Sequence, residues 1–137
     1  MDIRLLTEDD LELLQNATDE VFDLPVQKSL CAEFLNDPRH HIAAAMASGK
    51  IIGMASGVHY VHPDKPPELW INEVGVAEHY QRQGIGKQLM QVLFAKGKEL
   101  GCTNAWVGTD TDNAAAHKLY ESVGGRKEPF VVFDFDL

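Results

Sequence analysis

Apolar residues along the chain recur at two spacings, one typical of helices and one typical of strands. Between 85 and 100 they recur three or four positions apart, which predicts an amphipathic helix that ends at Gly101. Apolar runs at 69–76 and 105–109 flank this helix and are predicted to be strands. A strand, a helix and a second strand in this order predict a crossover that joins two parallel strands.

The N-terminal half of the chain predicts an antiparallel start to the sheet. Two apolar runs flank Ser48-Gly49-Lys50, which is typical of a hairpin connection. Thr7 and Asp10 have the spacing of a capping box at the start of a helix, and Asp37-Pro38 is expected to end the next helix. The elements predicted here are strands at 3–6, 42–47 and 51–61 and helices at 7–22 and 26–36.

The C-terminal part of the chain predicts one more helix and a last strand. Apolar residues at helical spacing over 113–123 are followed by Gly124-Gly125, which favours a helix end there. Residues 130–137 alternate between apolar and acidic side chains, as a half-buried strand does. Asp134 and Asp136 would then lie on one face of this strand, about 6.5–7 Å apart.

Composition and charge fit a single globular domain over residues 1–137. The chain has 12 Lys and Arg against 21 Asp and Glu, a formal charge of −9, which disfavours a protein that binds the phosphate backbone of nucleic acids. Ten of the acids lie in residues 1–37. They form either a solvated helix surface or a negative field that attracts a cationic substrate.

The sequence predicts neither a metal site nor membrane insertion. Cys31 and Cys102 lie far apart, outside any Cys-x-x-Cys motif, and are expected to be buried, reduced thiols. The six histidines share no spacing typical of metal ligands. No apolar run approaches the length of a membrane span or of a signal-peptide core. A cytoplasmic location is therefore the expectation.

The most informative segment is a glycine-containing turn at the start of the helix at 85–100. It reads Gln81-Arg82-Gln83-Gly84-Ile85-Gly86-Lys87, and free amides at a helix start bind phosphate groups. Leu89 replaces the third small residue of a dinucleotide fingerprint, and Gln88 replaces the hydroxyl residue of a P-loop. The spacing therefore excludes both motifs and leaves either another diphosphate site or an ordinary glycine turn.

Two spaced motifs together resemble the GNAT-type N-acetyltransferases. Gln81-x-x-Gly84-x-Gly86 is similar to their acyl-CoA pyrophosphate signature, and Asn113-x-x-Ala116-x-x-Leu119-Tyr120 to their second motif. The resemblance implies an α/β (α+β) fold with a mixed central sheet of six to seven strands and about four helices. It also implies acetyl-CoA as cosubstrate, without a metal, held by Val74, Val76, Gln81, Arg82, Gln83, Gly84, Ile85, Gly86, Lys87, Asn113 and Ala116.

A narrower resemblance over 69–137 concerns the acceptor of the acetyl group. The segments at 70–76, 83–85 and 133–136 are similar to those of GNAT-type aminoglycoside 3-N-acetyltransferases, although Glu73 replaces the usual Asp. This resemblance implies a cationic small-molecule amine as acceptor, bound by Asp134 and Asp136. The alternatives are a peptide, protein or polyamine acceptor, or a module that binds acetyl-CoA without turnover. Terminal strands of this family often pair between chains, which allows a homodimer.

Acetyl transfer to an amine needs a base and an acid, because the attacking nitrogen must lose a proton and the leaving sulfur gains one. Glu73 is the candidate base, directly or through one water, because its apolar neighbours in the sequence would raise its pKa. Tyr120 is the candidate acid and is placed beside the sulfur by the family resemblance. Gly75 marks either an interrupted strand that offers an amide to the thioester oxygen or a close packing contact. Asn113 would cap the helix.

Overall fold

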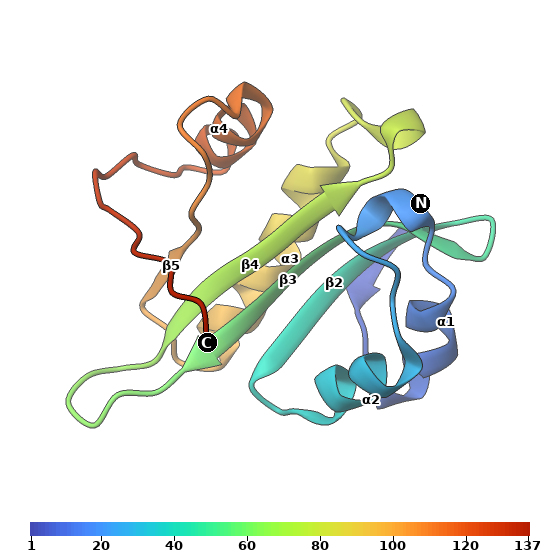
Figure 1. Cartoon of the computed structure of the whole chain (residues 1–137), viewed down its shortest axis with the longest axis horizontal. Helices are drawn as coiled ribbons and strands as arrows, with labels where there is room; N and C mark the ends of the chain where they lie inside the picture. The colour runs from blue at the N-terminus through green and yellow to red at the C-terminus, as the bar shows by residue number, and fades with distance from the viewer.

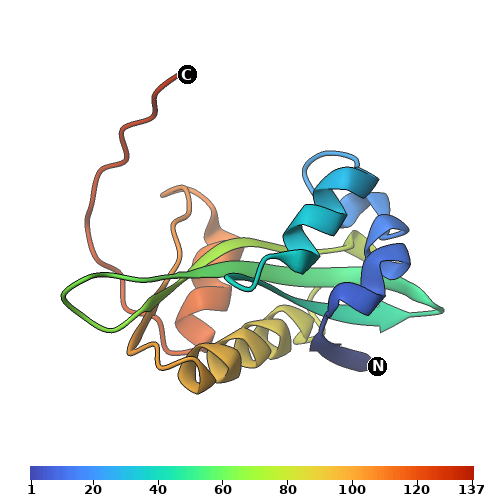
Figure 2. The same cartoon turned by 90° about the horizontal axis from the view of Figure 1, so that it is seen from below.

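The computed structural model describes all residues from Met1 to Leu137. Its centre is a sheet of five strands in the order β1-β2-β3-β4-β5. One layer of helices covers each face of the sheet, with α1 and α2 on one side and α3 and α4 on the other (Figures 1 and 2). The strands are β1 (Asp2–Leu5), β2 (His40–Ala47), β3 (Lys50–Tyr60), β4 (Glu68–Val76) and β5 (Asn104–Trp106).

The helical elements include three single 3₁₀ turns. The α-helices are α1 (Leu11–Gln15), α2 (Lys28–Asn36), α3 (Ile85–Glu99) and α4 (Ala114–Ser122), and the turns are η1 (Glu8–Asp10), η2 (Asp19–Val21) and η3 (Glu78–Tyr80). None of the helices is both long and apolar enough to cross a membrane.

The predicted mixed sheet and its parallel crossover are confirmed. Strands β1 to β4 pair antiparallel with their neighbours, whereas β4 and β5 pair in parallel across α3. The pairing of β4 with β5 covers only Glu68–Trp70 against Asn104–Trp106. The rest of β4 therefore has a partner on the β3 side alone.

The core is divided between the two faces of the sheet. Leu69, Ile85 and Leu89 belong to the cluster on the side of α3, while Leu14 and Ile42 belong to the cluster beneath α1 and α2. The second cluster also contains Cys31, which is a buried free thiol as predicted. Each helical layer thus buries its apolar stripe against the sheet, which is the arrangement that stabilises a two-faced domain.

The predicted first helix is correct at its start and too long at its end. Thr7 and Asp10 form the expected capping box. The helix ends at Gln15, and the side chain of the following residue, Asn16, donates to the Glu12 carbonyl at 2.8 Å and so covers the end of the helix. The following backbone is then held by the sheet, since the Thr18 amide donates to the Ile51 carbonyl.

The predicted closing strand at 130–137 is wrong. Residues 126–137 make no backbone hydrogen bond and pair with no strand, so the sheet has five strands instead of six to seven. The Phe130 ring packs edge-on against Trp106, with centroids 6.2 Å apart, and the following chain leads away from the body of the protein (Figure 2). An alternating pattern forms a strand only where a free sheet edge lies alongside it, and β5 offers an edge of three residues.

Candidate active site

The second half of β4 forms one wall of the candidate site. Residues beyond Trp70 pair with β3 but not with β5, which leaves one edge of this part of β4 without a neighbouring strand. Side chains alternate across the strand: Val74 and Val76 pack against the core on the α3 side, while Glu73 lines a pocket on the opposite face. The open edge can accept an extended ligand as an added strand.

The irregular position in β4 is Asn72, so of the two explanations considered for Gly75 the interrupted strand does not apply at that residue. The ladder between β3 and β4 skips one residue, since Ser56 pairs with Glu73 and Gly57 with Ile71. Gly75 instead pairs regularly with Met54. Its missing side chain makes room for the backbone of Val21, whose carbonyl oxygen a Cβ at this position would overlap. The packing explanation for Gly75 is therefore the correct one.

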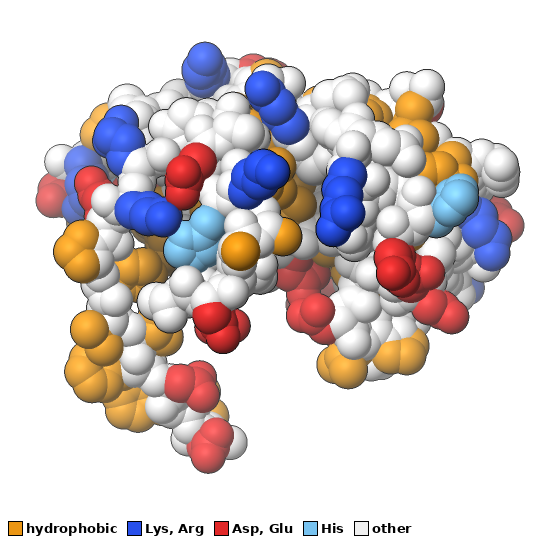
Figure 3. Space-filling view, turned by 90° about the horizontal axis from the view of Figure 1, so that it is seen from above, with side chains coloured by type: hydrophobic (Ala, Val, Ile, Leu, Met, Phe, Trp, Pro, Cys, Tyr) orange, Lys and Arg blue, Asp and Glu red, His pale blue; other side chains and the backbone are white.

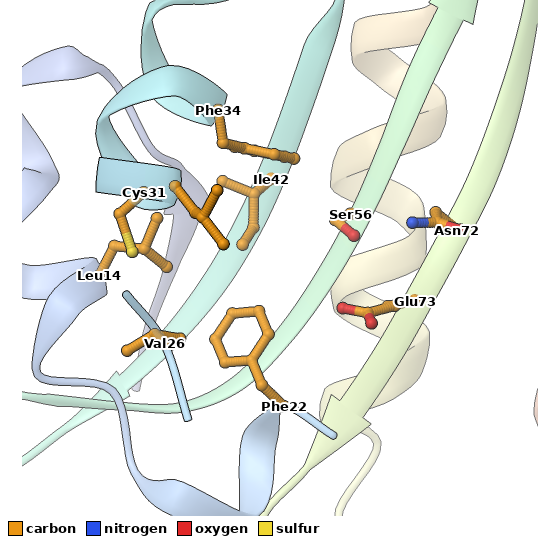
Figure 4. A pocket seen from close by; sticks show the side chains of 10 residues that line it. Leu14, Phe22, Val26, Cys31, Phe34, Ile42, Ser56, Asn72 and Glu73 are labelled. Carbon is orange, nitrogen blue, oxygen red and sulfur yellow. The ribbon is translucent and has the colours of Figure 1, made fainter. Parts of the chain in front are cut away.

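Glu73 has the environment of a carboxylate that holds its proton more readily than usual. Its pKa is raised, mainly because burial disfavours the charged form and also because the Asp23 carboxylate lies nearby. The predicted apolar surroundings exist, but they come from other parts of the chain than its neighbours in sequence. Figure 4 shows the Glu73 carboxylate directed toward Phe22, in a pocket that also contains Val26.

The glycine-containing turn that the sequence singles out as a candidate anion site lies between β4 and α3. None of the amides from Arg82 to Lys87 donates to a backbone acceptor, and no side chain caps the first turn of α3. Gly84 adopts the left-handed conformation, with φ at +78°, and a Cβ there would meet no protein atom. Six consecutive free amides beside a helix start are an arrangement that can bind an anionic group.

The side chains of the turn have several roles. The Gln81 amide donates to the Val76 carbonyl at 2.9 Å and thereby fixes the turn to the end of β4. The Gln83 amide donates to the His79 carbonyl at 3.4 Å. Ile85 is buried in the core on the α3 side. Arg82 and Lys87 are exposed, and Figure 3 shows Lys and Arg side chains spaced across the end of the molecule that carries this turn.

Helix α4 lies beside α3 and carries Tyr120. Asn113 caps it, since its side-chain oxygen accepts from the Ala116 amide at 3.1 Å. A Cβ on Gly86 would lie 3.2 Å from the Leu119 side chain, so the glycine permits close approach of the two helices. Tyr120 packs against the core on the α3 side, and burial raises the pKa of its hydroxyl. The hydroxyl group of Tyr120 is therefore neutral at neutral pH.

The structure separates the predicted acidic residues into different groups. Asp134 and Asp136 are exposed on the C-terminal segment and do not line the Glu73 pocket. Of the acids in and just after η2, Asp23 is the one whose negative charge raises the pKa of Glu73. Glu20 accepts from the Glu78 amide at 2.8 Å and so links η2 to η3. No cluster of three or more His, Cys, Asp and Glu side chains has a metal-binding arrangement.

The apolar pocket lining was not identified from the sequence. It includes Val26, Leu30 and Phe34, which recur four residues apart and so share one face in and just before α2. That spacing was the available signal. The spacing does not show that these residues lie beside Glu73, because the position of α2 relative to β4 depends on the tertiary fold.

Comparisons with known proteins agree with this geometry. Residues 6–125 match the acetyltransferase (GNAT) family. The chain is 35% identical over 92 residues to the N-alpha-acetyltransferase RimI of Mycobacterium tuberculosis (strain ATCC 25618 / H37Rv), a match that covers 66% of this chain and 54% of RimI. The chain therefore spans about half the length of this relative.

Two solved structures are similar to this one over nearly its whole length. An aminoglycoside acetyltransferase, meta-AAC0020, from an uncultured soil metagenomic sample was solved in complex with sisomicin; it has a TM-score of 0.86 and 24% identity over 99% of this chain and 95% of its own. The aminoglycoside N-acetyltransferase AAC(6')-Iy in complex with CoA has a TM-score of 0.80 and 22% identity. This match covers 98% of this chain and 93% of the chain of AAC(6')-Iy. At these identities the likeness establishes the fold, and together with the match over 6–125 it shows that the chain belongs to the acetyltransferase (GNAT) family.

Proposed function

We propose that this chain transfers the acetyl group of acetyl-CoA to a primary amine. The observation that carries this proposal is the row of free amides from Arg82 to Lys87, adjacent to a strand with an open edge and a half-buried carboxylate at Glu73. The amides fit a diphosphate, the edge fits an extended amide-containing arm, and the carboxylate fits a base.

The residues proposed to hold acetyl-CoA come from β4, from the turn and from the start of α4. The diphosphate would bind the amides of the turn, with Arg82 and Lys87 adding positive charge. The arm would run along β4 at Val74 and Val76. Acetyl-CoA would supply the activated acetyl thioester. The residues proposed to hold the coenzyme are Val74, Val76, Gln81, Arg82, Gln83, Gly84, Ile85, Gly86, Lys87, Asn113 and Ala116.

Glu73 and Tyr120 would handle the two protons of the reaction. The amine nitrogen attacks the acetyl carbon, and its proton passes to Glu73 directly or through one water. The bond from the acetyl carbon to sulfur breaks, and Tyr120 donates a proton to the leaving thiolate. The two side chains lie on opposite faces of the sheet, on either side of the strand along which the arm would lie. The acetyl group would therefore be approached from both sides.

The acceptor is proposed to be a primary amine that carries positive charge before it reacts. One candidate is an aminoglycoside, modified at its 3-amino group and held by Asp134 and Asp136. The fold shared with two aminoglycoside acetyltransferases supports the class of acceptor, although one of the two is named for the 6' position and so does not support the 3-amino group. The second is an N-terminal amine of a peptide, supported by the 35% identity to an N-alpha-acetyltransferase. The charge of −9 favours cationic acceptors in both cases. A cytoplasmic location and a homodimer remain predictions.

The proposal is tested by incubating the protein with acetyl-CoA and a panel of aminoglycosides, polyamines and peptides while the free thiol of CoA is measured. We expect thiol release with at least one amine. Glu73→Gln should lower kcat by about 10² or more, in line with the loss of a general base, while CoA affinity is retained. Binding of CoA without thiol release from any amine would leave only the non-catalytic module.

A further inference from the structure

The pocket beside Glu73 is apolar on all sides except one. It has a volume of about 200 Å³ and lies between β2 to β4 and the segment that contains Phe22, Val26 and α2. Ser56, Asn72 and Glu73 form its polar wall, and every other side chain that lines it is hydrophobic. Figure 4 shows the Phe22 ring and the Phe34 ring on the side facing these three polar residues.

The division of the pocket into a polar and an apolar wall gives the ligand an orientation. The only charged side chain in the lining is that of Glu73, and the nearby Asp23 adds to the negative field there. An ammonium or amine group would therefore be held at the β4 wall. A substituent attached to the same molecule would extend toward Phe22, Val26 and Leu30.

The size and exposure of the lining fit a hydrocarbon group. A dry cavity of about 150 Å³ lined by Leu, Ile and Phe is large enough to bind benzene. The pocket has about 200 Å³, enough for an aromatic ring and a short linker. Leu30 lines the pocket and is still 55% exposed, so that part of its apolar surface is uncovered by the chain itself. Hydroxyl and ammonium groups placed against this wall would lose their hydrogen bonds to water without gaining partners.

We propose that the acceptor is a primary amine whose nitrogen lies within two or three bonds of an aromatic or branched aliphatic group, and that this group fills the pocket formed by Phe22, Val26, Leu30 and Phe34. The proposal rests on the proposed acetyl transfer and specifies its acceptor. The same chemistry is present in a small arylalkylamine and in a peptide whose first residue is apolar. An unsubstituted polyhydroxylated amine fits this wall poorly.

The experiment compares matched amines in two arms, with thiol release as the readout. One arm uses 2-phenylethylamine and ethanolamine; the other uses tripeptides that begin with Phe or Ser and are otherwise identical. We expect kcat/KM to be about tenfold or more higher for the apolar member of at least one pair, because each buried methylene contributes about tenfold. The arm with the larger ratio identifies the source. Equal or higher kcat/KM for the polar member of both pairs, or a kcat/KM for kanamycin that equals or exceeds that of the better apolar amine, would overturn the proposal.

Failure of acetyl transfer and failure of the pocket assignment are separable. If no amine releases thiol, the proposed function is wrong, and calorimetric titration of the protein with 2-phenylethylamine and ethanolamine then decides the pocket assignment. Tighter binding of 2-phenylethylamine supports the assignment. Equal affinities contradict it.

A pair of leucine variants tests whether the hydrocarbon group of the acceptor binds in this pocket. Leu30 lines the pocket, whereas Leu24 is 77% exposed and does not line it. Leu30→Asp should raise the KM for the apolar acceptor about tenfold, because a carboxylate then faces the hydrocarbon group, with CoA affinity unchanged. Leu24→Asp should change KM by less than about twofold, as expected for an exposed site. Equal effects of the two variants would exclude this pocket as the binding site.

Discussion

The backbone carbonyl of Val21 occupies the space that a side chain at Gly75 would fill. This contact seats the η2 region directly on β4, so that Phe22 and Asp23 come to lie beside Glu73. Phe22 and Asp23 therefore take their places beside Glu73 because a glycine of β4 leaves room for the backbone of Val21.

Gly75→Ala should disturb the acceptor pocket more than the coenzyme site. The added methyl group would push Val21 away from β4, at a cost of about 1–3 kcal/mol in the free energy of unfolding, as is typical of overpacking. We expect a higher KM for the acceptor and an unchanged Kd for CoA, measured by initial rates and by calorimetry. Gly108→Ala is the control, because its Cβ would make an ordinary contact at 3.8 Å. A Gly75→Ala enzyme with the parent KM and stability would contradict this role of the contact.

Gly84→Ala should lower CoA affinity by about tenfold or more. The substitution forces an alanine into the left-handed conformation, which costs about 1 kcal/mol, and places a methyl group in the space where the diphosphate is proposed to bind. Gly101 also has a positive φ, +87°, and an open surrounding, but it lies at the other end of α3. Gly101→Ala should therefore cause a similar loss of stability in thermal unfolding without a change in the Kd for CoA. Similar Kd values for the two variants would argue against the turn as the diphosphate site.

The pH dependence of the reaction should follow Glu73. A base acts only when deprotonated, so kcat/KM should fall as pH decreases through the raised pKa of this carboxyl. Asp23→Asn removes a neighbouring negative charge, which lowers the pKa of Glu73 and should move the acidic limb of the pH profile to lower pH. Asp19→Asn changes an acid within η2, which is not among the causes of the Glu73 shift, and should leave the limb in place. An identical profile for all three proteins would exclude Asp23 as a cause of the shift.

Local signals in the sequence predicted those parts of the site that depend on a single stretch of chain. The start of α3 at Ile85 and the cap at Asn113 were both identified correctly, because a turn and a cap are determined by a few adjacent residues. The function of Gly75 was left open between two explanations, because it depends on Val21, far away in the sequence. The apolar wall of the pocket was missed for the same reason.

The C-terminal segment shows a different reason for failure. Its alternation describes a strand with one apolar face, but hydrogen bonding by a strand requires a free edge of similar length. Strand β5 ends at Trp106, and the sequence does not reveal how long a neighbouring edge will be. The strand count was therefore the part of the fold that the pattern could not determine.

Tyr120→Phe should lower kcat strongly and leave CoA binding unchanged. The ring still packs on the α3 side of the core, but the proton for the leaving sulfur is missing, an effect of about 10² or more for a general acid. Because burial raises the pKa of the Tyr120 hydroxyl, the parent enzyme should lose activity on the basic side only above the ordinary range of a tyrosine. Tyr80 also packs against this core, and Tyr80→Phe serves as the control with parent kcat. Equal kcat for both variants would remove Tyr120 from the reaction.

The exposed C-terminal segment should mediate association of two chains. Its side chains at Val131, Phe133 and Phe135 are between 76% and 79% exposed, and Figure 3 shows the segment projecting from the body with apolar and acidic side chains. Mutual burial of these three side chains on each of two such segments would remove roughly 900 Å² of surface from water, judged from the areas of aromatic side chains, which is close to the roughly 1,000 Å² that a specific interface needs.

We therefore expect the intact protein to sediment with the mass of a dimer and a chain truncated after Pro129 to sediment as a monomer. The combined substitution Phe133→Asp and Phe135→Asp should also give a monomer, because charges on the apolar face cannot be buried without partners. The double variant Asp134→Asn and Asp136→Asn keeps the apolar face and should stay dimeric. If these two acids bind the acceptor, the KM for the acceptor should rise in this variant as well. A monomeric intact protein at all concentrations would show that the segment has no partner in a second copy, and an unchanged KM would remove the two aspartates from the site.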